Sequence, residues 1–272
     1  MTQELAGPRA LFGGRAPHRS GSIVEFEGVS LSFGGVQAIR DVSFKVAEGE
    51  LFAIIGPNGA GKTSIFNCLS GVYKPQQGTI RFRGEDLQGM RPDRIAGLGV
   101  ARTFQNIELF EHMTVLDNLM LGRHLRMKGT WWDNGVYLGR TKRQEMANRA
   151  VVEDIIDFLE IAQWRKYPVA LLPYGVQKRV ELGRALAMEP EVLLLDEPVA
   201  GMNLEETEDM ARFVLDIRLE LGIAIILVEH DMGLVMDIAD RVMVLDFGQK
   251  IAEGSPAQVA SDPEVIKAYL GE

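Results

Sequence analysis

The sequence predicts an α/β fold in which helices cover both faces of a mostly parallel sheet. Short apolar segments recur along the chain and alternate with helical patterns, which is typical of parallel sheets. Three of these segments are apolar at almost every position, as expected of strands that are buried on both faces. They span residues 51–55, 192–195 and 223–228.

Other strands are indicated by alternating apolar and polar residues, the pattern of a half-buried strand. Segments 23–27 and 29–33 alternate in this way, and 43–46 continues the pattern. We expect further strands at 79–82, 100–104 and 242–245.

The middle of the chain, from about 106 to 186, is mostly helical in pattern. Thr114 with Asp117 is a capping pair for a helix through Leu119, and a charged helix is expected at about 143–161 after a loop at 131–135. A later helix starts at Asn203 with Glu206. Its spacing predicts one buried face, formed by Met210, Phe213, Val214 and Ile217.

Composition sets the broad class of the protein. Of 272 residues, 46% are hydrophobic and 25% are charged, which suits a globular protein. Residues 1–22 are rich in Gly, Pro, Ala and Arg and lack the apolar centre of a signal peptide, so we expect a flexible tail. A net charge of −9 disfavours nucleic acid as a partner. A single cysteine, Cys68, excludes an internal disulfide and favours a reducing compartment.

No apolar run approaches the roughly 18 residues of a membrane-spanning helix. We therefore expect any membrane role to come through partner proteins.

Residues 56–63 form a complete G-x-x-x-x-G-K-T phosphate-binding loop between a buried strand and a helix. Glycines let backbone N–H groups wrap phosphates, and the helix N-terminus attracts the same anion. Lys62 is expected to reach the β- and γ-phosphates, and the Thr63 hydroxyl to bind Mg²⁺. The expected nucleotide contacts of this loop are Gly56, Pro57, Asn58, Gly59, Ala60, Gly61, Lys62, Thr63 and Ser64.

A buried strand at 192–195 ends in two acids, Asp196 and Glu197. The carboxyl end of such a strand lies at the same sheet edge as the phosphate-binding loop. Asp196 is expected to hold Mg²⁺, and Glu197 to polarise the attacking water as a general base. The alternative is a solvated strand end followed by a turn.

With these motifs in order, the chain from Ile23 onward resembles the ATPases of ABC transporters. The resemblance implies a P-loop NTPase core with an antiparallel β subdomain and a helical subdomain inserted at 105–187, all within one domain at 23–272. It also implies ATP and Mg²⁺ as cofactors and ATP hydrolysis coupled to transport. Three residues gain roles from it: Phe33 as the ring that stacks on adenine, Gln105 as a contact of Mg²⁺ or water, and His230 as a contact of the γ-phosphate.

The segment aligned with the ABC signature L-S-G-G-Q departs from that pattern. It comprises Leu172, Pro173, Tyr174, Gly175, Val176 and Gln177. Pro173 replaces the serine that bonds the γ-phosphate held by the opposite subunit, and proline offers neither a hydroxyl nor an N–H. Residues 200–203, Ala-Gly-Met-Asn, replace S-A-L-D. We therefore expect a heterodimer with a second, unlike ABC ATPase, with a homodimer as the alternative.

A narrower resemblance is to ATPases of high-affinity branched-chain amino acid importers. It rests on residues 64–75, on 102–110, on the Tyr174–Gly175 variant and on the ending A-Y-L-G-E. It implies two membrane permeases, a separate solute-binding protein and a peripheral position at the cytoplasmic face of the inner or plasma membrane. Residues 109–115 would receive a permease helix. The alternatives are a lipopolysaccharide-type export ATPase and a soluble, non-transport ABC ATPase.

Overall fold

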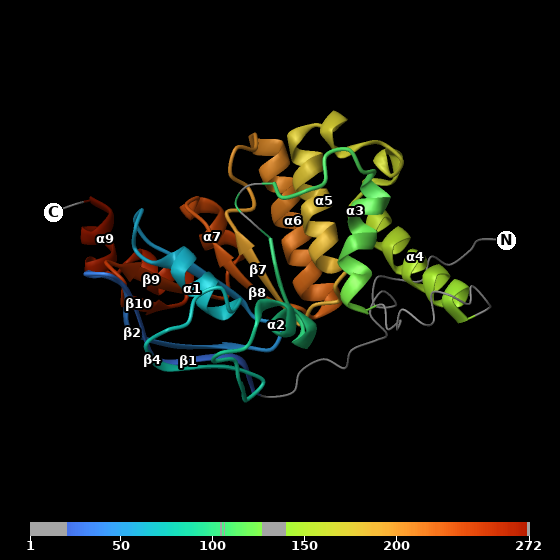
Figure 1. Ribbon diagram of the computed structural model, residues 1–272. Coiled ribbons are helices and arrows are strands. Elements are labelled where there is room, and N and C mark those ends of the chain that lie inside the picture. The colour runs from blue at the N-terminus through green and yellow to red at the C-terminus, as the bar shows by residue number, and fades with distance from the viewer. Residues whose placement is uncertain (1–20, 104, 106, 127–139, 271–272) are drawn as a thin grey trace.

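The computed structural model of the chain describes residues 21–103, 105, 107–126 and 140–270, and two sheets organise them (Figure 1). The six-stranded sheet has the order β10-β9-β3-β8-β7-β6. Neighbouring strands in it run parallel except for β10, which is antiparallel to β9. Its strands are β3 (Leu51–Ile55), β6 (Val100–Arg102), β7 (Val192–Asp196), β8 (Ala224–Val228), β9 (Arg241–Asp246) and β10 (Gln249–Gly254).

The second sheet is antiparallel and has the order β2-β1-β4-β5. Its strands are β1 (Ser22–Phe33), β2 (Val36–Ala47), β4 (Gln77–Phe82) and β5 (Glu85–Asp86). The two sheets meet through three aromatic rings. Phe26 stacks on Phe44 with ring centroids 4.5 Å apart, and Phe44 stacks on Phe52 of β3 at 5.3 Å. These stacked rings bury a large apolar area where the sheets face one another.

Two groups of helices lie toward opposite ends of the molecule. The helices named in the structure are α1 (Lys62–Leu69), α2 (Pro92–Leu98), α3 (Val115–Gly122), α4 (Arg140–Phe158), α5 (Tyr174–Leu186), α6 (Leu204–Leu221), α7 (Met232–Ile238), α8 (Pro256–Ala260) and α9 (Pro263–Leu270). Helices α3, α4 and α5 contact one another at one end of the molecule, and α7, α8 and α9 lie toward the other end (Figure 1).

The six-stranded sheet divides the core into two parts. Leu51, Ala53 and Ile55 face the side that includes α3, α5 and α6, whereas Phe52 and Ile54 face α1 and the antiparallel sheet. Side chains alternate between the faces of a strand, so a strand buried on both faces must be apolar at every position. All residues of β3, β7 and β8 are buried, which confirms that prediction.

The predicted helix starts are confirmed in detail. Thr114 caps α3 and its side chain accepts the N–H of Asp117. Asn203 and Glu206 form a reciprocal capping box at α6. The apolar face predicted for α6 is buried, as the spacing of its residues requires: Met210, Phe213, Val214 and Ile217.

Several boundaries differ from the prediction. Segments 23–27 and 29–33 belong to one strand, β1. The alternating pattern breaks between them because the register shifts between Phe26 and Val29, where Gly28 has φ of +59°. The strand predicted to reach 104 ends at Arg102, and the helix predicted at 143–161 runs Arg140–Phe158. The short elements α2, α7, α8, β5 and β10 were not predicted. The loop predicted at 131–135 and residues 1–20 of the expected tail lie outside the described residues.

None of the helices among the described residues has both the length and the hydrophobicity that a membrane span requires.

Replacing Phe213 by Ala should destabilise the protein by about 3–5 kcal/mol. Phe213 is fully buried on α6, and the guanidinium carbons of Arg179 and Arg212 lie 5.0 and 4.4 Å from its ring centroid. The substitution leaves a cavity and removes both cation–π contacts. Urea unfolding measures the change, with Leu219→Ala on the exposed side of the same helix as the control. Equal losses in the two variants would contradict this assignment of the core.

Candidate active site

The phosphate-binding loop connects β3 to α1 and is closely packed. Gly56, Gly59 and Gly61 have φ of +147°, +82° and +104°, a region that side chains disfavour. A Cβ at Gly56 would collide with the carbonyl oxygen of Leu245, and one at Gly61 with the carbonyl oxygen of Ala38. The loop is thus held against β9 and β2, and glycine is required at both positions.

Lys62 turns back into this loop. Its ammonium donates to the carbonyl oxygens of Gly56, at 2.6 Å, and Pro57, at 3.0 Å. Burial lowers the pKa of Lys62, and the nearby carboxylates of Glu197 and Asp196 oppose that shift. A buried ammonium bonded to neutral carbonyls would form stronger bonds with anionic oxygens, so the loop suits a phosphate ligand. Thr63 is exposed beside it, at the second position of α1.

Asp196 ends β7 and is 3% exposed. Its Oδ2 accepts a bond of 2.8 Å from Arg102, and the other terminal nitrogen of Arg102 donates to Oδ1 of Asn67 at 2.6 Å. Arg102 therefore connects the acidic strand end to α1, a role that the sequence analysis missed. A single arginine at the end of a short strand gave little signal of it.

Glu197 has φ of +50°, uncommon for a residue other than glycine. Its N–H still donates to the carbonyl oxygen of Val228 at 2.8 Å, and the positive φ then turns the backbone away from β7. Its Oε2 accepts a bond of 2.9 Å from Nε2 of Gln105, and its Oε1 lies 2.7 Å from Nε2 of His230. The structure thus brings together the three candidates for water activation, although they lie far apart in the sequence.

Glu229 is a further buried carboxylate that the sequence analysis did not select. Its Oε1 accepts the N–H of Val199 at 3.1 Å, and its Oε2 accepts the N–H of His230 at 3.0 Å. Burial raises the pKa of Glu229, while these backbone donors act in the opposite direction. It joins the backbone after Glu197 to the backbone of His230. The only indication in the sequence was the position of Glu229, directly between the apolar strand that ends at Val228 and His230.

Phe33 lies at the tip of the β1–β2 hairpin and is 46% exposed. Phe33 pairs with Val36 on the neighbouring strand β2. Two residues further along β2, the carbonyl oxygen of Ala38 lies against Gly61 of the phosphate-binding loop. The hairpin therefore presents an aromatic face next to the loop. Such a face is available for stacking on a planar base.

The signature segment forms the N-terminus of α5, with Pro173 as its N-cap residue and no side-chain cap. The Tyr174 hydroxyl donates to the carbonyl oxygen of Ala200 at 3.0 Å. Gly175 packs so tightly on Glu206 that a Cβ would collide with its carboxylate. Gln177 bonds back to the carbonyl oxygen of Leu172, and Lys178 donates to the carbonyl oxygen of Gln105 at 2.9 Å. These contacts tie the segment to the start of α6 and to Gln105.

The donor groups fit a triphosphate with a hard divalent cation. A hydroxyl (Thr63), an amide (Gln105) and a carboxylate (Asp196) are oxygen ligands of the kind that Mg²⁺ prefers. The glycine loop has no room for a Cβ at Gly56 or Gly61 and holds a buried ammonium. The arrangement is suited to binding a nucleotide and activating water at its terminal phosphate.

Gly56→Ala should weaken phosphate-ligand binding far more than Gly59→Ala. Both positions have positive φ, so both variants are strained, but nothing lies within 4 Å of a Cβ at Gly59. Only the Gly56 variant must displace the backbone of β9. Calorimetric titration with a nucleotide, together with urea unfolding, measures both effects. Similar losses of affinity in the two variants would show that the positive φ alone, and not the contact with β9, makes glycine necessary at position 56.

Comparison with known families agrees with this geometry. A family model described as ABC transporter matches residues 39–200, more than half of the chain. A second model, described as branched-chain amino acid ATP-binding cassette transporter, matches residues 249–272.

Individual relatives match along most of the chain. It is 41% identical over 253 residues to the high-affinity branched-chain amino acid transport ATP-binding protein BraF of Pseudomonas aeruginosa, covering 92% of this chain and 98% of the relative. It is 39% identical over 255 residues to LivG of Escherichia coli, which carries the same description, with the same coverage.

A solved structure of a nucleotide-free ATP-binding cassette from an ABC transporter superposes with a TM-score of 0.81. It is 31% identical, and the match covers 93% of this chain and all of that one. The fold, the loop and the acidic strand end therefore all agree: the chain belongs to the ABC transporter family and is one of its ATP-binding subunits.

Proposed function

We propose that this chain hydrolyses ATP to energise the uptake of branched-chain or closely related amino acids through partner permeases. The observation that carries the proposal is the cluster of Gln105, Glu197 and His230 beside the phosphate-binding loop. The 39–41% identity to branched-chain amino acid transport proteins supports the choice of cargo.

Each residue of the site receives a role. Phe33 stacks on adenine, and the loop from Gly56 to Ser64 holds the phosphates. Mg²⁺ bound near Thr63, Gln105 and Asp196 would neutralise charge on the β- and γ-phosphates. Glu197 orients and polarises the attacking water, and His230 contacts the γ-phosphate.

The bonds of Glu197 impose a condition on this chemistry. Both of its carboxylate oxygens are engaged by side chains, one by Gln105 and one by His230. A general base must contact the water that it activates. Each carboxylate oxygen keeps a second lone pair, so the water must approach Glu197 from a side that Gln105 and His230 leave open.

The altered signature supports a heterodimer. Pro173 has no hydroxyl or N–H to offer a phosphate across an interface, and the Tyr174 hydroxyl is bonded to Ala200 of its own chain. The phosphate-binding loop of this chain would be completed by an intact signature from an unlike ATPase. The reciprocal site would receive the altered one and turn over more slowly.

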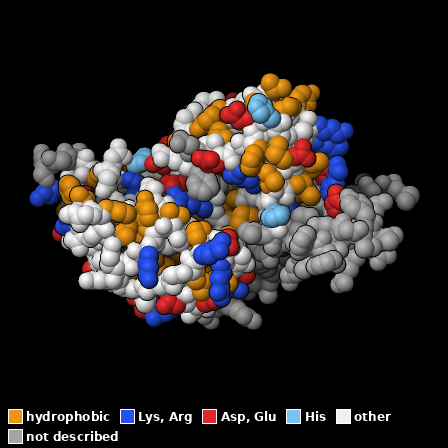
Figure 2. Space-filling model, viewed as in Figure 1, with side chains coloured by type: hydrophobic (Ala, Val, Ile, Leu, Met, Phe, Trp, Pro, Cys, Tyr) orange, Lys and Arg blue, Asp and Glu red, His pale blue; other side chains and the backbone are white. Residues whose placement is uncertain are grey.

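The end of the molecule that contains α3, α4 and α5 offers a docking surface for a permease. Phe110, Tyr167 and Leu171 are half or more exposed, and Figure 2 shows hydrophobic side chains gathered over this end. Backbone hydrogen bonds join the segment around Phe110 to the segment around Leu171. The N–H of Ala170 donates to the carbonyl oxygen of Glu111, and the N–H of Val169 to that of Met113. Val115 is fully buried, so only part of segment 109–115 is free to bind a permease helix. This surface would bring the chain to the cytoplasmic face of the membrane.

Glu197→Gln should retain ATP binding and lower turnover by roughly 10²–10⁴-fold. The amide keeps the shape of the side chain but is a poor base. Steady-state phosphate release and equilibrium ATP binding are both measured in the assembled transporter. Glu220→Gln, an exposed change at the end of α6, is the control and should behave as wild type. Unchanged turnover in Glu197→Gln would remove this residue from the mechanism.

Partner identity is tested by purifying the tagged Glu197→Gln chain from gently solubilised membranes with ATP present. We expect mass spectrometry to recover a second, different ATPase and two multi-spanning permeases. Reconstitution of the wild-type complex with a solute-binding protein should then support leucine uptake into vesicles. Recovery with an export machinery, or with ribosomal proteins alone, would exclude import. A homodimer with two equal, fast sites would exclude the heterodimer.

A further inference from the structure

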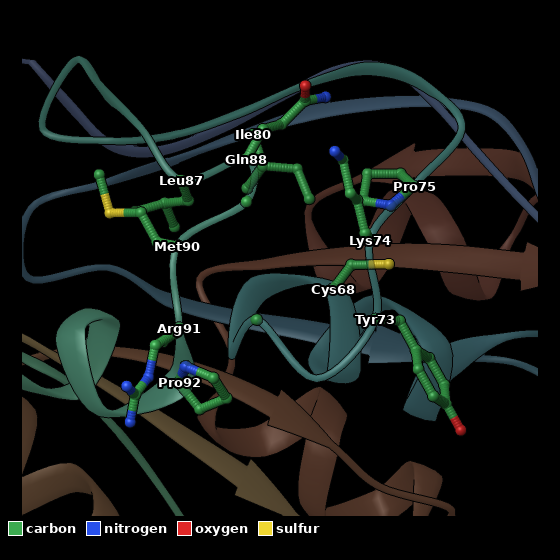
Figure 3. A pocket seen from close by; sticks show the side chains of 12 residues that line it. Cys68, Tyr73, Lys74, Pro75, Ile80, Leu87, Gln88, Met90, Arg91 and Pro92 are labelled. Carbon is green, nitrogen blue, oxygen red and sulfur yellow. The ribbon is translucent and has the colours of Figure 1, made fainter.

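The ring of Phe33 is held by a segment that follows the phosphate-binding helix. The rings of Phe33 and Tyr73 meet edge to face, with centroids 4.9 Å apart and an interplanar angle of 69°. Tyr73 stands at the border of a pocket, but its ring extends away from the side chains of Lys74 and Pro75 (Figure 3). The tyrosine is therefore directed at the hairpin tip and not into the pocket.

The backbone beside Phe33 is fixed by the same segment. The side-chain amide of Gln76 accepts the N–H of Ser32 at 2.9 Å and donates to the carbonyl oxygen of Ser32 at 3.1 Å. The N–H of Gln76 also donates to the carbonyl oxygen of Ser30 at 3.0 Å. Gln76 thus pairs with the end of β1 as a neighbouring strand residue would. It extends the pairing of β1 with β4, whose last paired residues are Ser30 and Gln77.

The segment is in turn anchored to the phosphate-binding helix. The N–H groups of Val72 and Tyr73 both donate to the carbonyl oxygen of Asn67, at 2.8 and 2.9 Å, in the last turn of α1. The side chain of Asn67 bonds Arg102, which bonds Asp196. A short series of bonds therefore runs from the acidic strand end, through α1, to the exposed ring.

An exposed ring on a Gly-Gly hairpin must lose conformational freedom when it stacks on a base, and that loss weakens binding. A ring already held in place loses less. We propose that Tyr73 and Gln76 are positioning residues that pre-organise Phe33 for adenine and set its spacing from the phosphate-binding loop. The proposal rests on the function proposed above for Phe33 and identifies what fixes the base-binding half of that site.

The test compares two ligands that share phosphates but differ in having a base. Binding of MgATP and of Mg-tripolyphosphate to the full chain is measured by calorimetry. Tyr73→Ala should weaken ATP binding by about two- to tenfold and leave tripolyphosphate binding unchanged. Gln76→Ala should do the same, whereas Tyr73→Phe, which keeps the ring, should bind as wild type. Val72→Ala, an exposed change at the adjacent residue, is the matched control.

A double-mutant cycle separates positioning from a direct effect. Because Tyr73 acts through Phe33, Tyr73→Ala should cause no further loss of ATP affinity in a Phe33→Ala background. In the assembled transporter, Tyr73→Ala should raise the KM for ATP by the same factor and leave kcat unchanged.

Three results would overturn the inference: wild-type ATP affinity in Tyr73→Ala when Phe33→Ala is weakened, additive losses in the double variant, or equal weakening for both ligands. The last would indicate general damage to the loop. If Phe33→Ala itself binds ATP normally, the base-stacking role in the proposed function fails and the inference fails with it. The single variants therefore distinguish the two failures.

Discussion

The register of three parallel strands places the chemistry of this protein. In β3, β8 and β7, the residues Ile54, Val228 and Asp196 lie side by side in successive strands. The phosphate-binding loop follows the first strand, His230 follows the second, and Glu197 follows the third. The N–H of Glu197 continues the ladder by bonding Val228. A shift of one residue in any pairing would turn every side chain of that strand to the other face and separate the acids from the loop.

The register depends on burial rather than on charge. All residues of these three strands are buried and apolar up to the final acid of β7. The polar groups come only where the strands end, and most of them find partners there: Lys62 with the carbonyl oxygens of its own loop, Asp196 with Arg102, and Glu229 with two backbone N–H groups. A buried polar group without such a partner would destabilise the protein, so the site is assembled from pairs.

Much of this was accessible from the sequence because strong local signals agree. Fully apolar strands, the glycine loop and the capping pairs are decided by neighbouring residues, and the structure confirms them. What could not be predicted depends on distant contacts. Nothing near Tyr73 or Gln76 in the sequence indicates that they bind the end of β1, more than forty positions earlier for Gln76 and Ser32. Arg102, Glu229 and Lys178 likewise gain meaning only from partners supplied by other elements. The short helices α2 and α8 were missed because so few turns give little periodicity.

The two side-chain bonds of Glu197 limit how its carboxylate can turn. Gln105 and His230 each bond one oxygen of this carboxylate, and both come from the same chain as Glu197. The backbone carbonyl oxygen of Gln105 also accepts a hydrogen bond from the ammonium of Lys178 in α5. The orientation of the carboxylate that is expected to activate water is therefore set by side chains of this chain itself.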